Sequence, residues 1–195
     1  MCTILLQTIS RFMELTNDDV YHVKTFFKPL NAKNGTVLIG KNEFARNIYF
    51  INSGHLRYFN ISERGEEQTI HLFSPGEFAT SFCGFVNNTK SEEILHTITD
   101  SELLFINKDD LEKLFSLELK WQIFGRKLME YHLLEKEIRI INQISLSAKE
   151  RYLRLLETNS ILIKNVPMQY IASYIGIKPE SLSRIRKQLF LTNVK

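Results

Sequence analysis

The stretch from Met168 to Lys187 limits what this chain can fold into more than any other part of the sequence. Ile171, Ala172 and Ile175 share one face of a short helix, because positions one and four residues apart lie close together on a helical surface. Gly176 follows where that helix has to end and the chain has to turn sharply, which favours a residue without a Cβ atom. A second helix after such a turn completes a helix-turn-helix.

Pro179 begins this second helix, since its fixed φ suits a first turn and it lacks an N–H group that would stay unpaired. At 100° per residue the helix has two unlike faces. Its residues divide into an apolar and a polar set: Leu182, Ile185 and Leu189 against Glu180, Arg184 and Lys187. The spacings of both helices and of the glycine favour a DNA-reading motif over the alternative, an ordinary surface pair of helices with solvated charges.

Charge is unevenly distributed along the 195 residues, although the formal net charge is only +3. From Ser147 onward the chain carries nine Lys or Arg residues and three Glu residues, a net charge of +6, which leaves −3 for residues 1–146. A basic C-terminal segment behind a mildly acidic body indicates a polyanionic partner for that segment alone.

Between Thr36 and Ile106 the apolar residues recur in short or alternating runs, which are typical of β-strands. Gly54, Gly65 and Gly76 separate these runs at intervals of 11 residues. The rhythm indicates an antiparallel jelly roll, whose interior can hold one small ligand. The expected strands are 36–39, 48–51, 55–61, 68–73, 94–98 and 103–106.

Helix starts are expected on both sides of this region. Thr16 can cap one helix, and Asn107 or Asp109 can cap another. Ser147 and Glu150 have the spacing of a capping box, so a third helix begins there.

A long helix lies between the last two starts, because apolar residues recur every three or four positions over about six turns. So narrow a stripe on so long a helix usually pairs with a copy of itself, although it could instead cover the chain's own jelly roll. We favour a two-fold homodimer through residues 121–141, because a helix-turn-helix commonly reads paired half-sites. The stripe consists of Trp121, Phe124, Leu128, Tyr131, Leu134, Ile138 and Ile141.

The sequence therefore predicts an α+β chain with three parts. These are a jelly-roll sensor domain over residues 1–118, a dimerisation helix over 119–145 and a helix-turn-helix DNA-binding domain over 146–195. Within the last part, Ile161–Ile163 is expected to form a short strand, and Pro167 to begin the first helix of the motif.

Several classes of protein are disfavoured by what the sequence contains. Cys2 and Cys83 are too few for a disulfide framework or a four-thiolate metal or iron–sulfur site. The apolar run from Ile4 to Leu6 is far shorter than a signal peptide core, and no stretch approaches a membrane span. Neither a nucleophile motif nor a phosphate-binding Gly-rich loop is present. We expect a cytoplasmic protein that is not an enzyme and that uses no metal or other cofactor.

A jelly roll, a long helix and a helix-turn-helix, in this order and at this length, resemble the CRP/FNR family of bacterial transcription regulators. The likeness covers nearly the whole chain. It rests on Tyr49–Gly54 and Phe73–Phe78 in the jelly roll, and on Ile171–Gly176 and Glu180–Ile185 in the motif. It implies a sensor domain like the cyclic-nucleotide-binding domain, and as partners palindromic double-stranded DNA and RNA polymerase. Residues 190–195 are too few for the β-hairpin wing that normally follows the recognition helix.

In this family the recognition helix typically carries Arg-Glu near its start and a second Arg four residues after the Glu. Glu180 and Arg184 match this pattern, whereas Pro179 stands in place of the first Arg, which puts the family's consensus operator in doubt. Arg can donate two hydrogen bonds to guanine, and Glu can accept one from cytosine. The other expected DNA contacts are Lys178, Arg186 and Lys187, to phosphates, together with Ser181.

Family members that bind cyclic AMP carry a Gly-Glu pair for the ribose and, further along, an Arg with Ser or Thr for the phosphate. Thr80-Ser81 and Ser91-Glu92 fall at these positions instead. A phosphate buried beside Glu92 would meet a like charge in a medium of low dielectric constant, so we expect that cyclic AMP does not bind. Helix N–H groups near Thr80 could still hold another anion. The expected effector-binding residues are Thr80, Ser81, Phe82 and Ser91.

Other sensors and other functions stay open as alternatives. Oxygen sensing would need more cysteines, and none of the five histidines has the context of a haem ligand. An apolar pocket could be lined by Phe78, Phe82, Phe85 and Tyr58, although buried core is the more common role of such aromatic residues. The chain could instead be a nucleotide-binding regulatory module of a larger protein, which would not need a helix-turn-helix. A jelly-roll enzyme of the cupin kind would need closely spaced His and Glu ligands.

Overall fold

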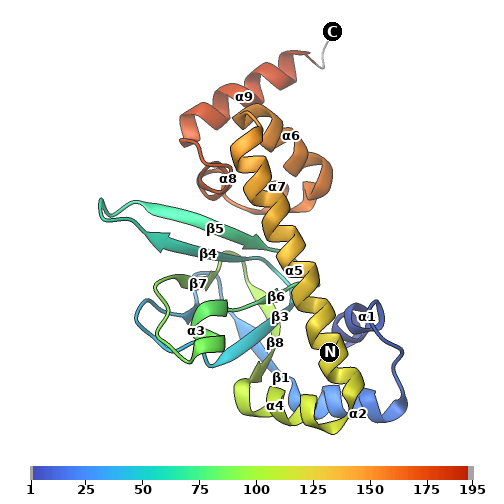
Figure 1. The fold of residues 1–195 in the computed structure, drawn as a ribbon. Helices are drawn as coiled ribbons and strands as arrows, with labels where there is room; N and C mark the ends of the chain where they lie inside the picture. Colours follow the sequence, from blue (N-terminus) through green and yellow to red (C-terminus); the bar gives the residue numbers. More distant parts are fainter. Residues whose placement is uncertain (1, 193–195) are drawn as a thin grey trace.

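The computed structural model describes residues 2–192, which form a strand-rich body, one long helix and a group of four helices (Figure 1). The strands are β1 (Lys28–Ala32), β2 (Val37–Ile39), β3 (Asn47–Ser53), β4 (Leu56–Ile61), β5 (Glu67–Phe73), β6 (Phe78–Ala79), β7 (Ile94–Thr97) and β8 (Ser101–Asn107). The helices are α1 (Thr3–Ser10), α2 (Asn17–Phe26), α3 (Phe82–Asn87), α4 (Lys108–Leu117), α5 (Leu119–Ser145), α6 (Ala148–Thr158), α7 (Ser160–Asn165), α8 (Met168–Tyr174) and α9 (Pro179–Thr192).

The strands form two antiparallel sheets, in the orders β1-β8-β3-β6 and β2-β7-β4-β5. Their inner faces enclose a core that includes Ile51, Leu56 and Leu95. The predicted jelly roll is confirmed, and each of the six expected strands is present. The pattern does not predict β1 or β6, because β1 is an edge strand that contains Pro29 and β6 has only two residues.

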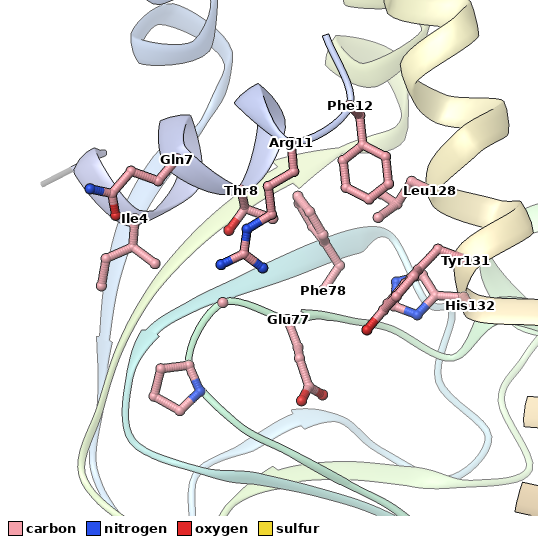
Figure 2. A pocket seen from close by; sticks show the side chains of 12 residues that line it. Ile4, Gln7, Thr8, Arg11, Phe12, Glu77, Phe78, Leu128, Tyr131 and His132 are labelled. Atoms are coloured by element: carbon pink, nitrogen blue, oxygen red, sulfur yellow. The ribbon is translucent and has the colours of Figure 1, made fainter. Parts of the chain in front are cut away.

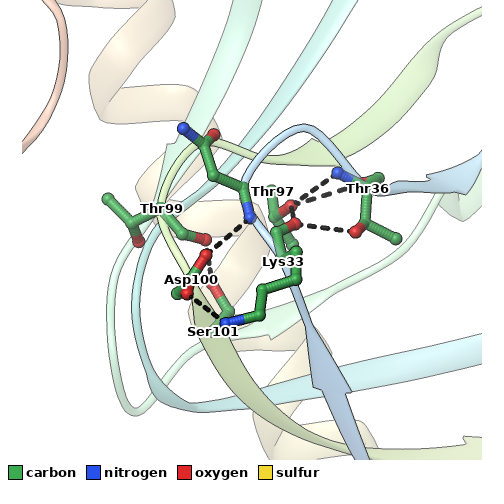
Figure 3. Close-up of polar contacts among 7 residues, drawn as sticks. Lys33, Thr36, Thr97, Thr99, Asp100 and Ser101 are labelled. Carbon is green, nitrogen blue, oxygen red and sulfur yellow. Dashed lines mark hydrogen bonds and ion pairs between the residues drawn. The ribbon is translucent and has the colours of Figure 1, made fainter.

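The chain passes from one sheet to the other between β1 and β2 and again between β7 and β8, and polar side chains join these two crossings (Figure 3). The Thr97 hydroxyl donates to the carbonyl of Lys33 at 2.6 Å, and Lys33 Nζ lies 2.8 Å from Asp100 Oδ2. Gly54 has a φ of +90°, and a Cβ atom added to it would lie 2.6 Å from the Asp100 carbonyl oxygen. This corner therefore requires a glycine.

Helix α5 packs one side against the jelly-roll body and the N-terminal helices (Figure 1). Trp121 and Phe124 are 0% and 5% exposed, in a core shared with Leu5 of α1 and Leu114 of α4. Their assignment to a dimer stripe is therefore wrong, because the chain's own helices cover them. The sequence pattern does not predict α1. Within residues 2–192, no helix has both the length and the apolar composition needed to cross a bilayer.

Helices α6 to α9 form a unit at the C-terminal end of α5 (Figure 1). The capping box at Ser147 is present, and α6 follows it. The strand expected at Ile161–Ile163 is wrong, because the Asn159 side chain accepts the N–H of Leu162 at 3.0 Å and starts α7 there. Residues 193–195, the end of the segment that is too short for a β-hairpin wing, lie outside the described residues.

Candidate nucleic-acid interface

The turn between α8 and α9 is closed by two backbone hydrogen bonds around Gly176. The N–H of Ile177 donates to the carbonyl of Ala172 at 3.0 Å, and the N–H of Gly176 donates to that of Ser173 at 3.1 Å. Together with the φ of +76° at Gly176, these bonds form a Schellman motif. The helix end predicted at Gly176 is confirmed, and the turn fixes the angle at which α9 leaves α8.

Helix α9 turns an apolar face inward and a charged face to solvent. Leu182 is fully buried, and Ile185 and Leu189 are partly buried against the same core. No described residue forms an ion pair or hydrogen bond with the side chains of Glu180 or Arg184, nor do these two pair with each other. The five charged residues expected at DNA are all exposed: Lys178, Glu180, Arg184, Arg186 and Lys187.

The two serines of α9 occupy different positions on the helix. Ser181 is partly buried at the edge of the charged face, whereas Ser183 is exposed between Glu180 and Lys187. Ser183 is the face residue that sequence reasoning missed, although its spacing of three from Glu180 and four from Lys187 was a usable signal. Arg186 lies to the side, with Nη1 3.8 Å from the sulfur of Met168.

The C-terminal end of α8 is held by side chains of α5 and α6. Arg139 Nη2 and Gln143 Nε2 donate to the carbonyl of Tyr174 at 3.2 and 3.1 Å. Arg151 Nε donates to the carbonyl of Ile175 at 2.9 Å, and the Arg139 guanidinium stacks on the Tyr174 ring at 3.9 Å. Cations are stabilising at the negative end of a helix dipole. These contacts therefore fix the first helix of the motif to α5.

A second attachment joins α8 to the β4–β5 hairpin through Arg57. This residue is 1% exposed, and its guanidinium lies 4.2 Å from the ring centre of Phe59 and 4.0 Å from that of Tyr170. It also pairs with the Glu67 carboxylate and donates to the Thr69 hydroxyl at 2.8 Å. Because Tyr170 belongs to α8, this stacked cation connects the helix-turn-helix with the jelly roll.

Two of the expected effector residues, Ser81 and Ser91, meet inside the jelly roll. They are 0% and 1% exposed, and their Oγ atoms are 2.8 Å apart. The Tyr58 hydroxyl donates to Glu93 Oε2 at 2.8 Å and lies 3.2 Å from Ser81 Oγ. Burial raises the pKa of Tyr58 well above its ordinary value, and Glu93 raises it further, so the hydroxyl stays protonated. The serines are thus bonded to groups of the protein itself.

The other two expected effector residues lie apart from this cluster. The Thr80 hydroxyl donates to the carbonyl of Asn47 at 2.8 Å. Phe82 is exposed, whereas Phe85 is buried in the jelly-roll core, so these aromatic residues do not line one apolar pocket. In the described part of the chain, no three His, Cys, Asp or Glu residues are grouped as metal ligands would be.

The side of α5 that points away from the jelly roll is mostly apolar and exposed; we call it the outer face of α5. Among the residues of the predicted stripe, Leu134 and Ile141 lie on it. An Arg126–Glu130 ion pair interrupts it. Its exposed apolar residues are Leu119, Ile123, Leu133, Leu134, Ile140, Ile141 and Ile144.

Comparison with known proteins gives the same arrangement. Residues 29–118 match the family model of the cyclic nucleotide-binding domain. FixK2 from Bradyrhizobium japonicum is similar at 19% identity and a TM-score of 0.75, over 86% of each chain. CLP from Xanthomonas campestris, described as a c-di-GMP responsive global regulator, is 21% identical with a TM-score of 0.68, over 89% of this chain and 91% of that chain.

A transcriptional regulator described as of the crp/fnr family, from Eubacterium rectale, is 18% identical with a TM-score of 0.68, over 91% of this chain and 85% of that chain. The sequence matches no curated protein. At these identities the structural likeness shows the fold, which extends through the jelly roll, α5 and the C-terminal helices.

Proposed function

We propose that this chain, which has the fold of the CRP/FNR regulators along most of its length, is a sequence-specific DNA-binding transcription regulator. The observation that carries the proposal is the charged face of α9. The Glu180 carboxylate and the Arg184 guanidinium have no partner among the described residues. The preceding helix α8, which the turn at Gly176 joins to α9, is held through Tyr170 near its start and Tyr174 at its end. A guanidinium on such a helix can donate to phosphates or base edges, and the carboxylate can accept a hydrogen bond from a base donor.

The roles on α9 follow from the chemistry of each side chain. Arg184 donates two hydrogen bonds to guanine, and Glu180 accepts one from cytosine in the major groove. Lys178, Arg186 and Lys187 contact phosphates and set the position of the helix without selecting a sequence. Ser183, on the same face, adds a short polar contact.

The outer face of α5 supports a homodimer as the functional unit. Exposed apolar side chains on one side of a long helix, here on both sides of the Arg126–Glu130 pair, are stabilised by packing against a second copy. To read two half-sites on one face of a duplex, the two copies of α9 in such a pair have to lie about 34 Å apart. Selection of bound fragments from a random DNA pool should therefore return a palindrome. An enriched sequence without two-fold symmetry would contradict the dimeric reading.

Replacement of Arg184 by alanine tests the base contact. We expect a loss of about 1–3 kcal/mol on the selected site and a relaxed preference at one base pair of each half-site. Lys187→Ala should weaken matched and mismatched sites alike and should lower the slope of the affinity against salt by about one. Both are measured by fluorescence titration over a salt series.

Arg46→Ala is the matched control for both variants, since Arg46 is exposed on the jelly roll, next to the start of β3. We expect it to leave DNA affinity unchanged. Equal losses on matched and mismatched DNA for Arg184→Ala would contradict the base contact.

The polar cluster around Glu93 supports the further proposal that cyclic AMP is not the effector. A cyclic phosphate near Ser81 and Ser91 would have to displace the hydrogen bond from Tyr58 and to lie beside the Glu93 carboxylate. Burying a phosphate beside a carboxylate of like charge costs on the order of several kcal/mol in binding free energy. Calorimetry should detect no cyclic AMP binding in the micromolar range, and a clear isotherm would refute the proposal.

A further inference from the structure

A cavity of about 330 Å³ lies outside the jelly roll, where α1, the turn before β6 and α5 meet (Figure 2). Its volume lies within the range of sites for small molecules, which begins at about 300 Å³. Helix α1 and the turn before β6 belong to the sensor part, and α5 leads to the helix-turn-helix. Phe78 of the apolar pocket considered from the sequence lines it, whereas none of the residues expected to contact DNA, and none of Thr80, Ser81, Phe82 and Ser91, does.

Opposite charges line this cavity without neutralising each other. Arg11, an exposed residue directly after α1, extends toward it, and Glu77 lies on the turn before β6 (Figure 2). The Arg11 side chain forms no ion pair or hydrogen bond with a residue in the described range. Glu77 has an imidazole contact, with His71 Nε2 3.5 Å from the carboxylate. The cavity therefore presents one free cation and one weakly paired anion.

A third polar group, from α5, also lines the cavity. Tyr131 of α5 lines the cavity on the side of Leu128 and His132 (Figure 2). Burial raises the pKa of Tyr131, Glu135 and Glu77 raise it further, and Arg11 acts in the opposite direction. The Tyr131 hydroxyl therefore stays protonated and can donate a hydrogen bond inside the cavity.

Apolar side chains complete the cavity. Phe12, Phe78 and Leu128 lie together beside the charged groups (Figure 2). A ligand with only an acidic group would be repelled by Glu77, and one with only an amine by Arg11. A molecule with both charges on a short backbone and an apolar side chain would satisfy the guanidinium, the carboxylate and the apolar surface together.

We propose that this cavity is a binding site for a small apolar α-amino acid, with its carboxylate on Arg11, its ammonium on Glu77 and its side chain against Phe12 and Phe78. The bound molecule would connect the segment after α1 with the turn before β6, beside α5. Binding here does not depend on DNA recognition, so the site stands or falls separately from the regulatory function.

Isothermal calorimetry on the full chain tests the site, with L-leucine, L-methionine and L-phenylalanine as probes. At least one should bind, whereas 3-phenylpropionate, which lacks the amine, and phenethylamine, which lacks the carboxylate, should bind at least about tenfold more weakly than L-phenylalanine or not at all. Arg11→Ala and Glu77→Gln should each weaken binding about tenfold or more, since each removes a charge-assisted hydrogen bond.

Arg46→Ala is the matched control and should bind as the unmodified chain does. Thermal unfolding of each variant verifies that it is folded, and Arg11→Lys, which keeps the charge, should retain more affinity than Arg11→Ala. The proposal is overturned if none of the three amino acids binds at millimolar concentration. It is also overturned if the acid or the amine alone binds as tightly, or if folded Arg11→Ala binds unchanged.

Discussion

Two adjacent residues of β4, Arg57 and Tyr58, belong to two polar clusters on opposite faces of the sheet. Tyr58 points into the jelly roll, where it bonds to Glu93 and Ser81. Arg57 points outward, where it lies under Tyr170 of α8. Side chains alternate between the faces of a strand, so one backbone segment serves both clusters.

The two clusters differ in what they connect. The inner one joins residues of the jelly roll alone, whereas the outer one joins the jelly roll to the helix-turn-helix. Both have most of their polar groups paired, as buried polar groups require. The difference teaches that the jelly roll stabilises itself with one face of β4 and positions the reading motif with the other.

Replacing Arg57 should give the largest effect and should separate the two faces. Arg57→Ala removes a buried cation from the rings of Phe59 and Tyr170, at a cost of about 3 kcal/mol in the free energy of unfolding. Urea denaturation measures the loss, and amide exchange should increase in α8. The control Arg64→Ala, exposed at the tip of the same hairpin, should change stability by about 0.5 kcal/mol or less. Unchanged exchange in α8 would show that the outer cluster does not hold the motif.

A smaller effect is expected from the inner face. Tyr58→Phe removes the hydroxyl that donates to Glu93 and should lower the free energy of unfolding by about 1–2 kcal/mol. Amide exchange should increase in the jelly roll and not selectively in α8. A selective increase in α8 would mean that the two faces of β4 are not independent.

The smallest effect is a pH dependence of stability that comes from His96, beside the Arg57 cluster. Burial, and then the nearby charge of Arg57, lower the pKa of His96 from its ordinary value of 6.5, against a weaker opposing effect of Glu67. The unfolded chain therefore binds more protons below pH 6.5, and His96 makes the free energy of unfolding fall as the pH drops through that range. Above it, this residue adds no pH dependence. His96→Gln should reduce the loss between about pH 7 and pH 5 by ~1 kcal/mol or less. An unchanged slope in urea titrations at several pH values would contradict this.

Local patterns predict most of the elements of the fold. The alternation in β4 and the capping signals at Thr16, Asn107 and Ser147 depend on neighbouring residues, and the structure has an element at each. The strand expected at Ile161–Ile163 is wrong because a local pattern can also be ambiguous. A short apolar run fits either period, and the cap that decides for a helix comes from the Asn159 side chain.

The errors at the sites come from long-range packing. The apolar stripe of α5 mixes residues of two faces, because nothing near Trp121 in the sequence shows that α1 and α4 cover it. The contact between Arg57 and Tyr170 joins residues far apart in the chain, so spacing cannot reveal it. The division of α9 into a buried apolar face and an exposed charged face is confirmed, because helical period alone decides it. The DNA contacts on that face stay a prediction, and the same period points to Ser183.

The outer face of α5 makes the protein's behaviour depend on its own abundance. If two copies share this face, the folded form gains stability as the concentration rises and loses it on dilution. A single copy would expose an apolar strip of the kind that attracts unintended contacts. Expression level would then set both the number of operators occupied and the fraction of chains that survive to occupy them.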